Sequence, residues 1–265
     1  MFRLIKNGRL MYYKIDSFEK TDLVRHCFTT RMGGVSKNEY AELNLRTNCN
    51  DDINNVWKNF KIICDEIGIN YKNLVFSKQV HEDIIYDVTK DDIGNGITKP
   101  NKLKSADGLI CGEPGIPLVI FSADCVPLFF LDKKERVIAL SHSGWKGTVK
   151  NIAAKTVNKM LNEYNSRPEN IICAIGPSIG ACHFEVGDEV AEIFAGISGG
   201  VLNKYNEKYH VNLQETIINQ LTDCGIKADN ITNAGICTYC NSDILFSHRK
   251  TGGKRGSLAA IMQLK

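Results

Sequence analysis

Four apolar runs between residues 107 and 142 follow one another closely and leave no room for a helix between them. Val, Ile, Leu and Phe dominate these runs, which is typical of buried strands. The runs occupy residues 107–111, 117–123, 127–131 and 136–142. Because strands that succeed one another without helices cannot form a regular βαβ alternation, we expect the α+β class with mixed β-sheets.

Three other segments carry apolar residues at helical spacing, and each has recognisable end signals. Asp51 and Asp52 suit the N-cap of the first and Asn212 that of the third, where Glu215 lies three residues on as in a capping box. The predicted helices lie at 53–67, 149–161 and 213–224. Further strands are expected at 23–29, 74–77, 83–88, 170–175, 231–236 and 257–264.

Two polar segments, 90–105 and 198–210, have the composition of surface loops, the second with a short strand or turn. No repeat of 20–50 residues stands out, and 265 residues suffice for one domain or for two. The amino-terminal residues lack the apolar core of a signal peptide, and no apolar run approaches the length of a membrane span.

The charge balance is nearly even, with 33 basic and 30 acidic residues and a formal net charge of +3. Such a small excess does not indicate nucleic acid or a membrane surface as a partner. Ten cysteines without a secretory signal or a framework-like spacing indicate reduced thiols. We therefore expect a cytoplasmic protein.

Three residues form a candidate metal site: His81, Cys125 and His142. Each follows a strand-like run and precedes a turn or break, where separate segments can converge. One thiolate and two imidazoles suit zinc or copper, and three protein ligands leave the fourth position open, as in catalytic zinc sites. The alternative is that the cysteine is a small core residue and the histidines are only hydrogen-bonded.

The segment after His142 adds an anion-binding feature. Gly144 and Gly147 flank Trp145 just before a helix that is expected to begin near Thr148, and a glycine turn before a helix N-terminus presents backbone donors. The Cys237–Cys240 pair is one C-x-x-C without a second pair, which favours a structural role. If Cys182 and His183 lie in a strand, they point to opposite faces and cannot act as a nucleophile and base.

Several motifs together resemble the YfiH-like family, also called laccase-domain or polyphenol oxidase proteins and more recently purine nucleoside phosphorylases. The resemblance covers the chain from about residue 24 to its carboxyl end. It rests on HCFTTRMGGVS (26–36), KQVHEDIIYDV (78–88), SADGLICGEPGIPLVIFSADCVPLFFLD (105–132), ALSHSGWKGT (139–148), AIGPSIGACHFEVG (174–187) and CTYCNSDILFSHRKTGG (237–253). The family fold is a single-domain, layered α/β structure with mixed sheets, so the resemblance implies a single domain over residues 1–265.

The resemblance implies that His81, Cys125 and His142 are the catalytic residues and bind zinc. It implies phosphorolysis of purine nucleosides to free base and ribose 1-phosphate. Adenosine deamination and methylthioadenosine phosphorolysis are further implied activities. We expect a monomer or weak homodimer whose partners are nucleosides and phosphate. The substrate-binding candidates that lie inside the matching motifs are Arg31, Lys146 and Arg249 for phosphate, and Asp107 and Glu185 for proton transfer or ribose hydroxyls.

Two other functions compete with zinc-dependent phosphorolysis. Cys125 with one of the two histidines forms a nucleophile–base pair in a metal-free hydrolase. A copper-dependent phenol oxidase is the weaker alternative, because the chain has six histidines and no His-x-His pair of the kind that builds a multicopper cluster. Copper itself is an acceptable ion for one thiolate and two imidazoles.

Overall fold

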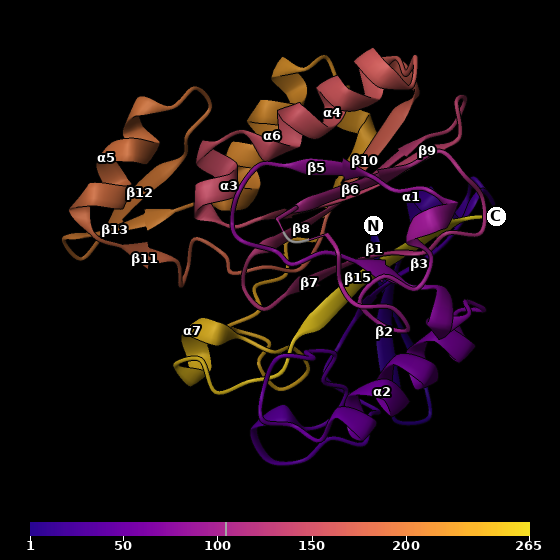
Figure 1. The fold of residues 1–265 in the computed structure, drawn as a ribbon. Coiled ribbons are helices and arrows are strands. Elements are labelled where there is room, and N and C mark those ends of the chain that lie inside the picture. Colours follow the sequence, from indigo (N-terminus) through magenta and orange to yellow (C-terminus); the bar gives the residue numbers. More distant parts are fainter. Residues whose placement is uncertain (104) are drawn as a thin grey trace.

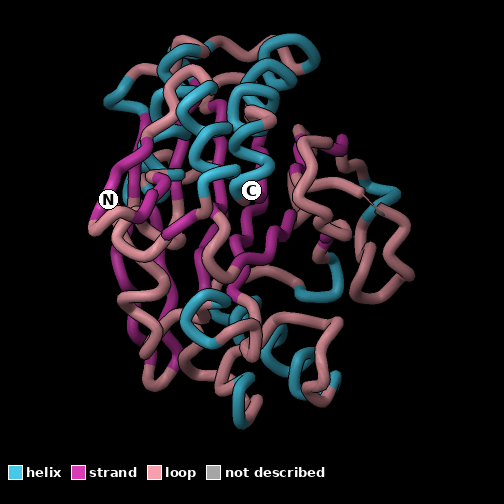
Figure 2. The backbone as a smooth tube through the Cα atoms, turned by 90° about the vertical axis from the view of Figure 1, so that its left-hand side faces the viewer, coloured by secondary structure: helices cyan, strands magenta, loops and turns pink. Residues whose placement is uncertain are grey.

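Two six-stranded sheets packed face to face form the centre of the protein, and helices cover both outer faces (Figure 1). The computed structural model describes residues 1–103 and 105–265. Figure 2 shows the strands side by side between a helical group at one end of the view and helical turns at the other. The expected α+β class, with layers and mixed sheets, is confirmed.

The sheets are mixed because three edge pairings, β4 with β7, β5 with β6 and β10 with β14, are parallel while the others are antiparallel. In spatial order the first sheet contains β1 (Phe2–Asn7), β2 (Leu10–Ile15), β3 (Val24–Thr29), β15 (Leu258–Leu264), β7 (Leu118–Ser122) and β4 (Val75–Phe76). The second contains β14 (Ile231–Asn233), β10 (Ile171–Ile175), β8 (Val126–Asp132), β9 (Val137–Ser143), β6 (Gly108–Cys111) and β5 (Ile85–Asp87). A small third sheet contains β11 (Glu185–Val186), β13 (Lys208–Val211) and β12 (Leu202–Tyr205).

The helices are short apart from three. They are α1 (Asp16–Glu19), α2 (Ile53–Glu66), α3 (Trp145–Val149), α4 (Ile152–Glu163), α5 (Asp188–Gly196), α6 (Leu213–Asp223) and α7 (His248–Thr251). Helix α2 covers the outer face of the first sheet, and α4 and α6 cover that of the second (Figure 1). Asp52 caps α2 and Asn212 caps α6 through their side chains, as predicted.

Strand β8 explains why the central runs are continuously apolar. Phe129 and Leu131 face the core between the two sheets, while Leu128 and Phe130 face the core under α4 and α6. Successive side chains of a strand point to opposite faces, so a strand between two apolar layers needs apolar residues at every position. A third core lies between α2 and the first sheet.

Most predicted elements are present, with two kinds of exception. Strands β1 and β2 and the small third sheet add elements that the sequence pattern did not predict, apart from the short strand expected within 198–210. The helix predicted at 149–161 is divided into α3 and α4 because Asn151 adopts a left-handed conformation with φ of 60°. Segment 90–105 forms no strand or α-helix among its described residues, and residue 104 lies outside them.

A membrane-spanning helix is absent from the described part of the chain, since none of its helices is both long and apolar enough. All ten cysteines are free thiols.

Candidate functional site

His81, Cys125 and His142 converge at one point where the two sheets meet. Cys125 lies in the connection that crosses from β7 in one sheet to β8 in the other, and His142 lies on β9 opposite Pro127. His81, from the loop between β4 and β5, places Nε2 3.9 Å from Cys125 Sγ. The two imidazole centroids are 5.0 Å apart, and one donor atom from each of the three residues lies within 4.8 Å of the others. The set can therefore hold one metal ion.

Asp107 holds the side chain of His142 and the backbone that carries His81. Its fully buried carboxylate accepts a hydrogen bond from His142 Nδ1 at 2.8 Å. The same carboxylate accepts backbone N–H groups at 2.9 Å from Val80, 3.0 Å from His81 and 2.9 Å from Glu82. Such an acceptor fixes the ring orientation of a metal-binding histidine and leaves its Nε2 atom free to bind the metal.

The charges in the cluster favour a thiolate. Burial would raise the pKa of Cys125, but His142 and His81 outweigh burial and lower that pKa to about 6. Burial would lower the pKa of His142, but Cys125 and Asp107 outweigh it and raise that pKa to about 9. The thiolate is the form of cysteine that binds metals and attacks electrophiles. Cys125, paired with His142, can therefore act either as a metal ligand or as a nucleophile.

Gly144 makes room for the cluster. A Cβ atom at this position would lie 3.0 Å from Cys125 Sγ and 3.1 Å from His81 Cδ2, closer than ordinary contacts allow. Strand β9 ends at Ser143 and α3 begins at Trp145, so the predicted order of strand, glycine and helix is confirmed, but the helix begins three residues before the expected Thr148 and includes Gly147. Glycine at this position therefore lets two cluster side chains lie close to the backbone without displacement.

A pocket of about 360 Å³ opens over the cluster. Its walls combine apolar and aromatic side chains with three basic ones. The lining residues are His81, Ala123, Asp124, Cys125, Trp145, Ile179, Phe184, Leu213, His248, Arg249 and Arg255. Flat apolar walls beside basic groups suit a ligand that has both an aromatic ring and an anionic part.

Of the five predicted substrate-binding residues, Arg249 is the one that lines this pocket. Its guanidinium nitrogens also donate to the carbonyl oxygens of His183 and Glu185 at 3.1 Å, and its charge lies 5.5 Å from the centroid of the Phe184 ring. Arg249 therefore ties the carboxyl-terminal segment to the pocket wall as well as facing the pocket.

The other four candidates lie outside the pocket lining. Arg31 donates to the carbonyl oxygens of Ala41 and Ser242, which occupies much of its guanidinium. Lys146 is exposed, and Glu185 pairs with Lys208. Asp107 lies beneath His142, so its observed contacts are with the cluster.

Arg255 and His248 are pocket residues that the sequence analysis missed. Arg255 donates from Nη1 to Ser257 Oγ and to the Gly256 carbonyl, while its buried Nε finds no hydrogen-bond partner among the described residues. His248 lies beside it, with Nδ1 3.5 Å from Arg255 Nη2. Basic residues that alternate with glycines near the carboxyl end were the available signal.

Asp124 was also missed, although it precedes Cys125. Its φ of 91° is unusual for a residue with a side chain. The carboxylate accepts hydrogen bonds from Thr238 Oγ1 at 2.6 Å and from the Arg249 backbone N–H at 2.6 Å. These bonds hold the strained turn and fasten two later segments beside Cys125.

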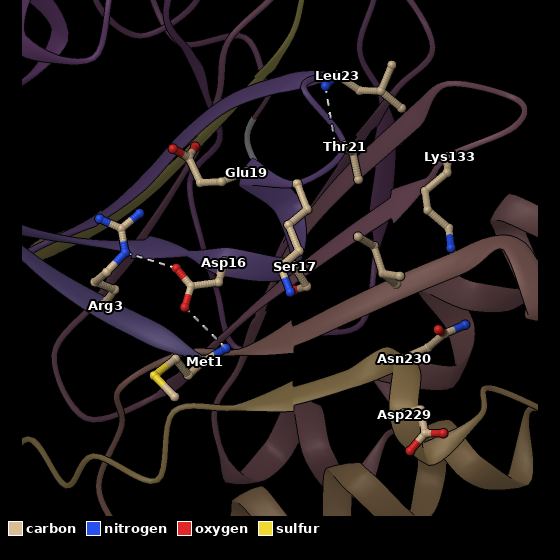
Figure 3. Close-up of a pocket in the computed structure, with 12 residues that line it drawn as sticks. Met1, Arg3, Asp16, Ser17, Glu19, Thr21, Leu23, Lys133, Asp229 and Asn230 are labelled. Carbon is tan, nitrogen blue, oxygen red and sulfur yellow. Dashed lines mark hydrogen bonds and ion pairs between the residues drawn. The ribbon is translucent and has the colours of Figure 1, made fainter.

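A larger hollow of about 1050 Å³ lies elsewhere, at the amino-terminal end of the first sheet (Figure 3). Its lining has no histidine or cysteine, and it shares no residue with the pocket over the cluster. Asp16 in its wall is paired with Arg3 and the terminal amine (Figure 3). Size therefore does not identify the site, whereas the convergence of reactive groups does.

The prediction that Cys182 and His183 point apart is wrong. They lie in a turn, not in a strand, and His183 Nδ1 is 3.2 Å from Cys182 Sγ. Cys240 Sγ lies 3.3 Å from the same nitrogen. The C-x-x-C pair thus has partners in space that sequence spacing did not reveal.

The chain is similar to known proteins over most of its length. The model of a family described as multi-copper polyphenol oxidoreductase laccase matches residues 25–265. Purine nucleoside phosphorylase YlmD of Bacillus subtilis is 32% identical over 90% of this chain and 87% of its own. A purine nucleoside phosphorylase of Bacteroides thetaiotaomicron is 34% identical over 99% of both chains. Purine nucleoside phosphorylase YfiH of Escherichia coli is 30% identical over 88% of this chain and 92% of its own.

Solved structures share the complete fold. YlmD from Geobacillus stearothermophilus superposes with a TM-score of 0.93 at 28% identity, over 100% of both chains. The hypothetical protein YfiH of Bacillus licheniformis superposes with a TM-score of 0.91 at 30% identity, over 100% of this chain and 99% of the other. These matches confirm the resemblance seen in the sequence motifs.

Proposed function

We propose that this chain, which belongs to the YfiH-like laccase-domain family, is a zinc-dependent purine nucleoside phosphorylase. The observation that carries the proposal is the convergence of His81, Cys125 and His142 beside a pocket with aromatic and basic walls, which His81 and Cys125 line. The names of the relatives supply the reaction class, and the pocket supplies a place for both substrates.

The donor set fits zinc on three counts. One thiolate and two imidazoles are ligands that zinc prefers, and three protein ligands leave one position for substrate. Asp107 supplies the carboxylate that commonly supports a ligating histidine. Gly144 leaves space where any side chain would press on Cys125 and His81. A zinc ion held there would supply a Lewis acid that polarises a bound oxygen.

The pocket walls divide between the two substrates. Trp145 and Phe184 present rings against which a purine can stack, and Arg255 and Arg249 present positive charge for phosphate. In phosphorolysis a phosphate oxygen forms a bond to C1′ of the ribose, the bond from C1′ to the purine nitrogen breaks, and that nitrogen takes up a proton. We assign the orientation of the phosphate to the two arginines.

The remaining predictions extend this proposal. Asp107 acts through His142 by positioning it, and a substrate role for Arg31, Lys146 and Glu185 stays a prediction. Deamination of adenosine and phosphorolysis of methylthioadenosine are secondary activities of the same pocket. We place the protein in the cytoplasm as a single domain that is monomeric or weakly dimeric. Ten free thiols support a reducing location.

The family description contains the word laccase, but we do not propose a multicopper oxidase activity for this chain. A multicopper oxidase gathers its copper ions with paired His-x-His motifs, and this sequence has none. Within the described residues, the cluster of His81, Cys125 and His142, which we call the pocket cluster, offers two imidazoles and one thiolate. A single copper ion in place of zinc is chemically acceptable there, but a multicopper centre is not.

Product analysis tests the proposal directly. Zinc-loaded protein is incubated with adenosine, inosine or guanosine across a phosphate series, and products are separated by chromatography. We expect base and ribose 1-phosphate in proportion to phosphate, and inosine from adenosine when phosphate is omitted. Base release that is independent of phosphate would replace phosphorolysis with hydrolysis.

A specific observation favours one rival function. Cys125 can serve as a nucleophile, His142 as its base and Asp107 as the carboxylate that orients the base, and the pKa of the Cys125 thiol is lowered. This arrangement would serve a metal-free cysteine hydrolase. Metal content separates the two, since activity that survives complete removal of zinc by a chelator supports the hydrolase and contradicts our proposal.

A further inference from the structure

A second cluster of metal-binding side chains lies outside the pocket. It consists of Cys182, His183, Cys237 and Cys240, which we call the four-donor cluster. The first two come from the turn before β11, and the other two from the segment that follows β14. One donor atom from each lies within 4.8 Å of all the others.

Three of the distances within the four-donor cluster are close to those around one tetrahedral ion, and all of them lie within 4.8 Å. Zinc binds sulfur at about 2.3 Å and imidazole nitrogen at about 2.0–2.1 Å, so tetrahedral ligands lie about 3.8 Å apart for two sulfurs and about 3.5 Å for sulfur and nitrogen. Cys182 Sγ and Cys240 Sγ are 3.7 Å apart. His183 Nδ1 is 3.2 Å from the first sulfur and 3.3 Å from the second. A disulfide would require about 2.05 Å between sulfurs.

The surrounding residues hold these donors in place. The Gly180 N–H donates to Cys237 Sγ at 3.3 Å, a contact that supports a thiolate ligand. The His183 ring stacks on Tyr239 with centroids 4.0 Å apart, which fixes its orientation. Lys250 places its ammonium 4.5 Å from the centroid of that tyrosine ring. Three thiolates around a divalent ion carry one net negative charge, and this lysine lies on the side where it offsets that charge.

We propose that the four-donor cluster binds a second zinc ion, with a structural role. Three cysteines and one histidine form a complete coordination shell without an open position, which is the pattern of structural zinc sites. The ion would join the turn 180–184 to the segment 237–240. Binding would release protons from the thiols and add its free energy to folding.

This ion would also shape the pocket, a role that rests on the proposed function. Ile179 and Phe184 line the pocket at either end of the turn that carries Cys182. Thr238, between the two cysteines of the C-x-x-C pair, donates to Asp124, the neighbour of Cys125. Fastening the two segments therefore fixes the aromatic wall and the turn that presents the reactive thiol.

Metal analysis of a matched set of variants tests the site. Protein reconstituted with Zn²⁺ and freed of excess metal is measured by elemental analysis as wild type, Cys240→Ser, His183→Cys and His81→Ala. We expect two zinc ions in wild type, one in Cys240→Ser, and two in His183→Cys, since a fourth thiolate replaces the imidazole. Cys224→Ser changes a half-buried thiol outside both clusters and should keep two. His81→Ala should lose the other ion, so failure of the two sites can be told apart.

Alkylation of the wild-type protein provides a test that does not depend on a variant folding. Cys182 and Cys240 are exposed, so they would react rapidly with N-ethylmaleimide if no metal held them. We expect both to be protected in the zinc-reconstituted protein and labelled after chelation, with sites mapped by mass spectrometry. Immediate labelling of both, or full zinc content in Cys240→Ser, would overturn the proposal. An intact mass two hydrogens short, with no protection by zinc, would replace it with a disulfide.

Discussion

The two donor clusters of this protein differ in coordination and in surroundings. The pocket cluster of His81, Cys125 and His142 has three donors at the junction of the two sheets, and a buried carboxylate supports one of them. The four-donor cluster has three thiols and one imidazole on two surface segments. Three donors beneath a pocket leave a position for substrate, whereas four donors close the shell.

Their supports show the same difference. Asp107 binds His142 and three consecutive backbone N–H groups, so the pocket cluster is built into the sheet framework. The four-donor cluster depends on a turn and on the C-x-x-C segment, with Gly180 and Tyr239 as neighbours. A framework fixed by buried hydrogen bonds suits catalysis, and segments outside the central sheets suit a structural ion that joins them. The experiments below separate the two roles, beginning with the largest expected effect.

Loss of the pocket thiol should abolish activity. We expect Cys125→Ala to lose its zinc and to lower kcat/KM for phosphorolysis by at least about a thousandfold, because the Lewis acid contributes several kcal/mol to the transition state. The measurements are steady-state kinetics and elemental analysis. Cys240→Ser, which leaves the pocket cluster intact, should retain far more activity. Equal zinc content in Cys125→Ala and wild type would refute the ligand assignment.

Removal of the supporting charge should weaken the pocket site without destroying it. Asp107 accepts four hydrogen bonds through its carboxylate, and in Asp107→Asn an NH2 group replaces one of the two oxygens. We expect zinc affinity at this site to fall about tenfold to a hundredfold, measured by competition with a chromophoric chelator. The four-donor cluster should bind zinc as before. Asp91→Asn, at an exposed position, is the matched control; affinity unchanged in both variants would remove the positioning role.

The two pocket arginines should respond differently to replacement by lysine. In Arg255→Lys we expect a higher KM for phosphate and phosphorolytic efficiency about tenfold to a hundredfold lower, because a charge-assisted contact contributes about 1.5–3 kcal/mol. Deamination needs no phosphate and should change little. Arg249→Lys also breaks contacts with the carbonyls of His183 and Glu185, so both reactions should fall together. Kinetics of both reactions on each variant decide, and a selective phosphate effect in Arg249→Lys would show that its contacts with the two carbonyls are dispensable for the pocket, whereas unchanged phosphate KM in both variants would contradict the assignment of phosphate to the arginines.

A histidine outside both clusters provides the smallest effect and a control for metal binding. Burial lowers the pKa of His26 to about 3, well below the value near 6.5 of an unfolded chain. The folded state therefore binds fewer protons, and its stability is complete above pH 6.5 and declines as pH falls toward 3. The expected loss is about 1.4 kcal/mol per pH unit within that window.

His26→Gln should flatten this dependence, because the amide can still accept the Ile15 N–H and does not titrate. Urea unfolding at pH 7, 6 and 5 measures the slope. Zinc content should equal that of wild type, since neither cluster includes His26. The same slope in both proteins would show that another group controls acid stability.

The sequence by itself determined the strand-rich class and the pocket cluster. Continuous apolar runs require strands buried on both faces, and this local requirement is readable from composition. His81, Cys125 and His142 were recognisable because each interrupts or follows such a run, and because their motifs resemble a family. Capping residues such as Asp52 and Asn212 were also readable, since their hydrogen bonds span two or three residues.

Only the tertiary structure decided which distant residues meet. Cys182 and His183 are more than fifty residues from the C-x-x-C pair in sequence. In the fold, Cys240 Sγ nevertheless lies 3.7 Å from Cys182 Sγ and 3.3 Å from His183 Nδ1. Asp107 became a support for His142, and Arg255 became a pocket residue, through the packing of β6 and β9 and the return of the carboxyl-terminal segment. Periodicity reports the face on which a side chain lies, whereas sheet order and turn geometry determine what it faces.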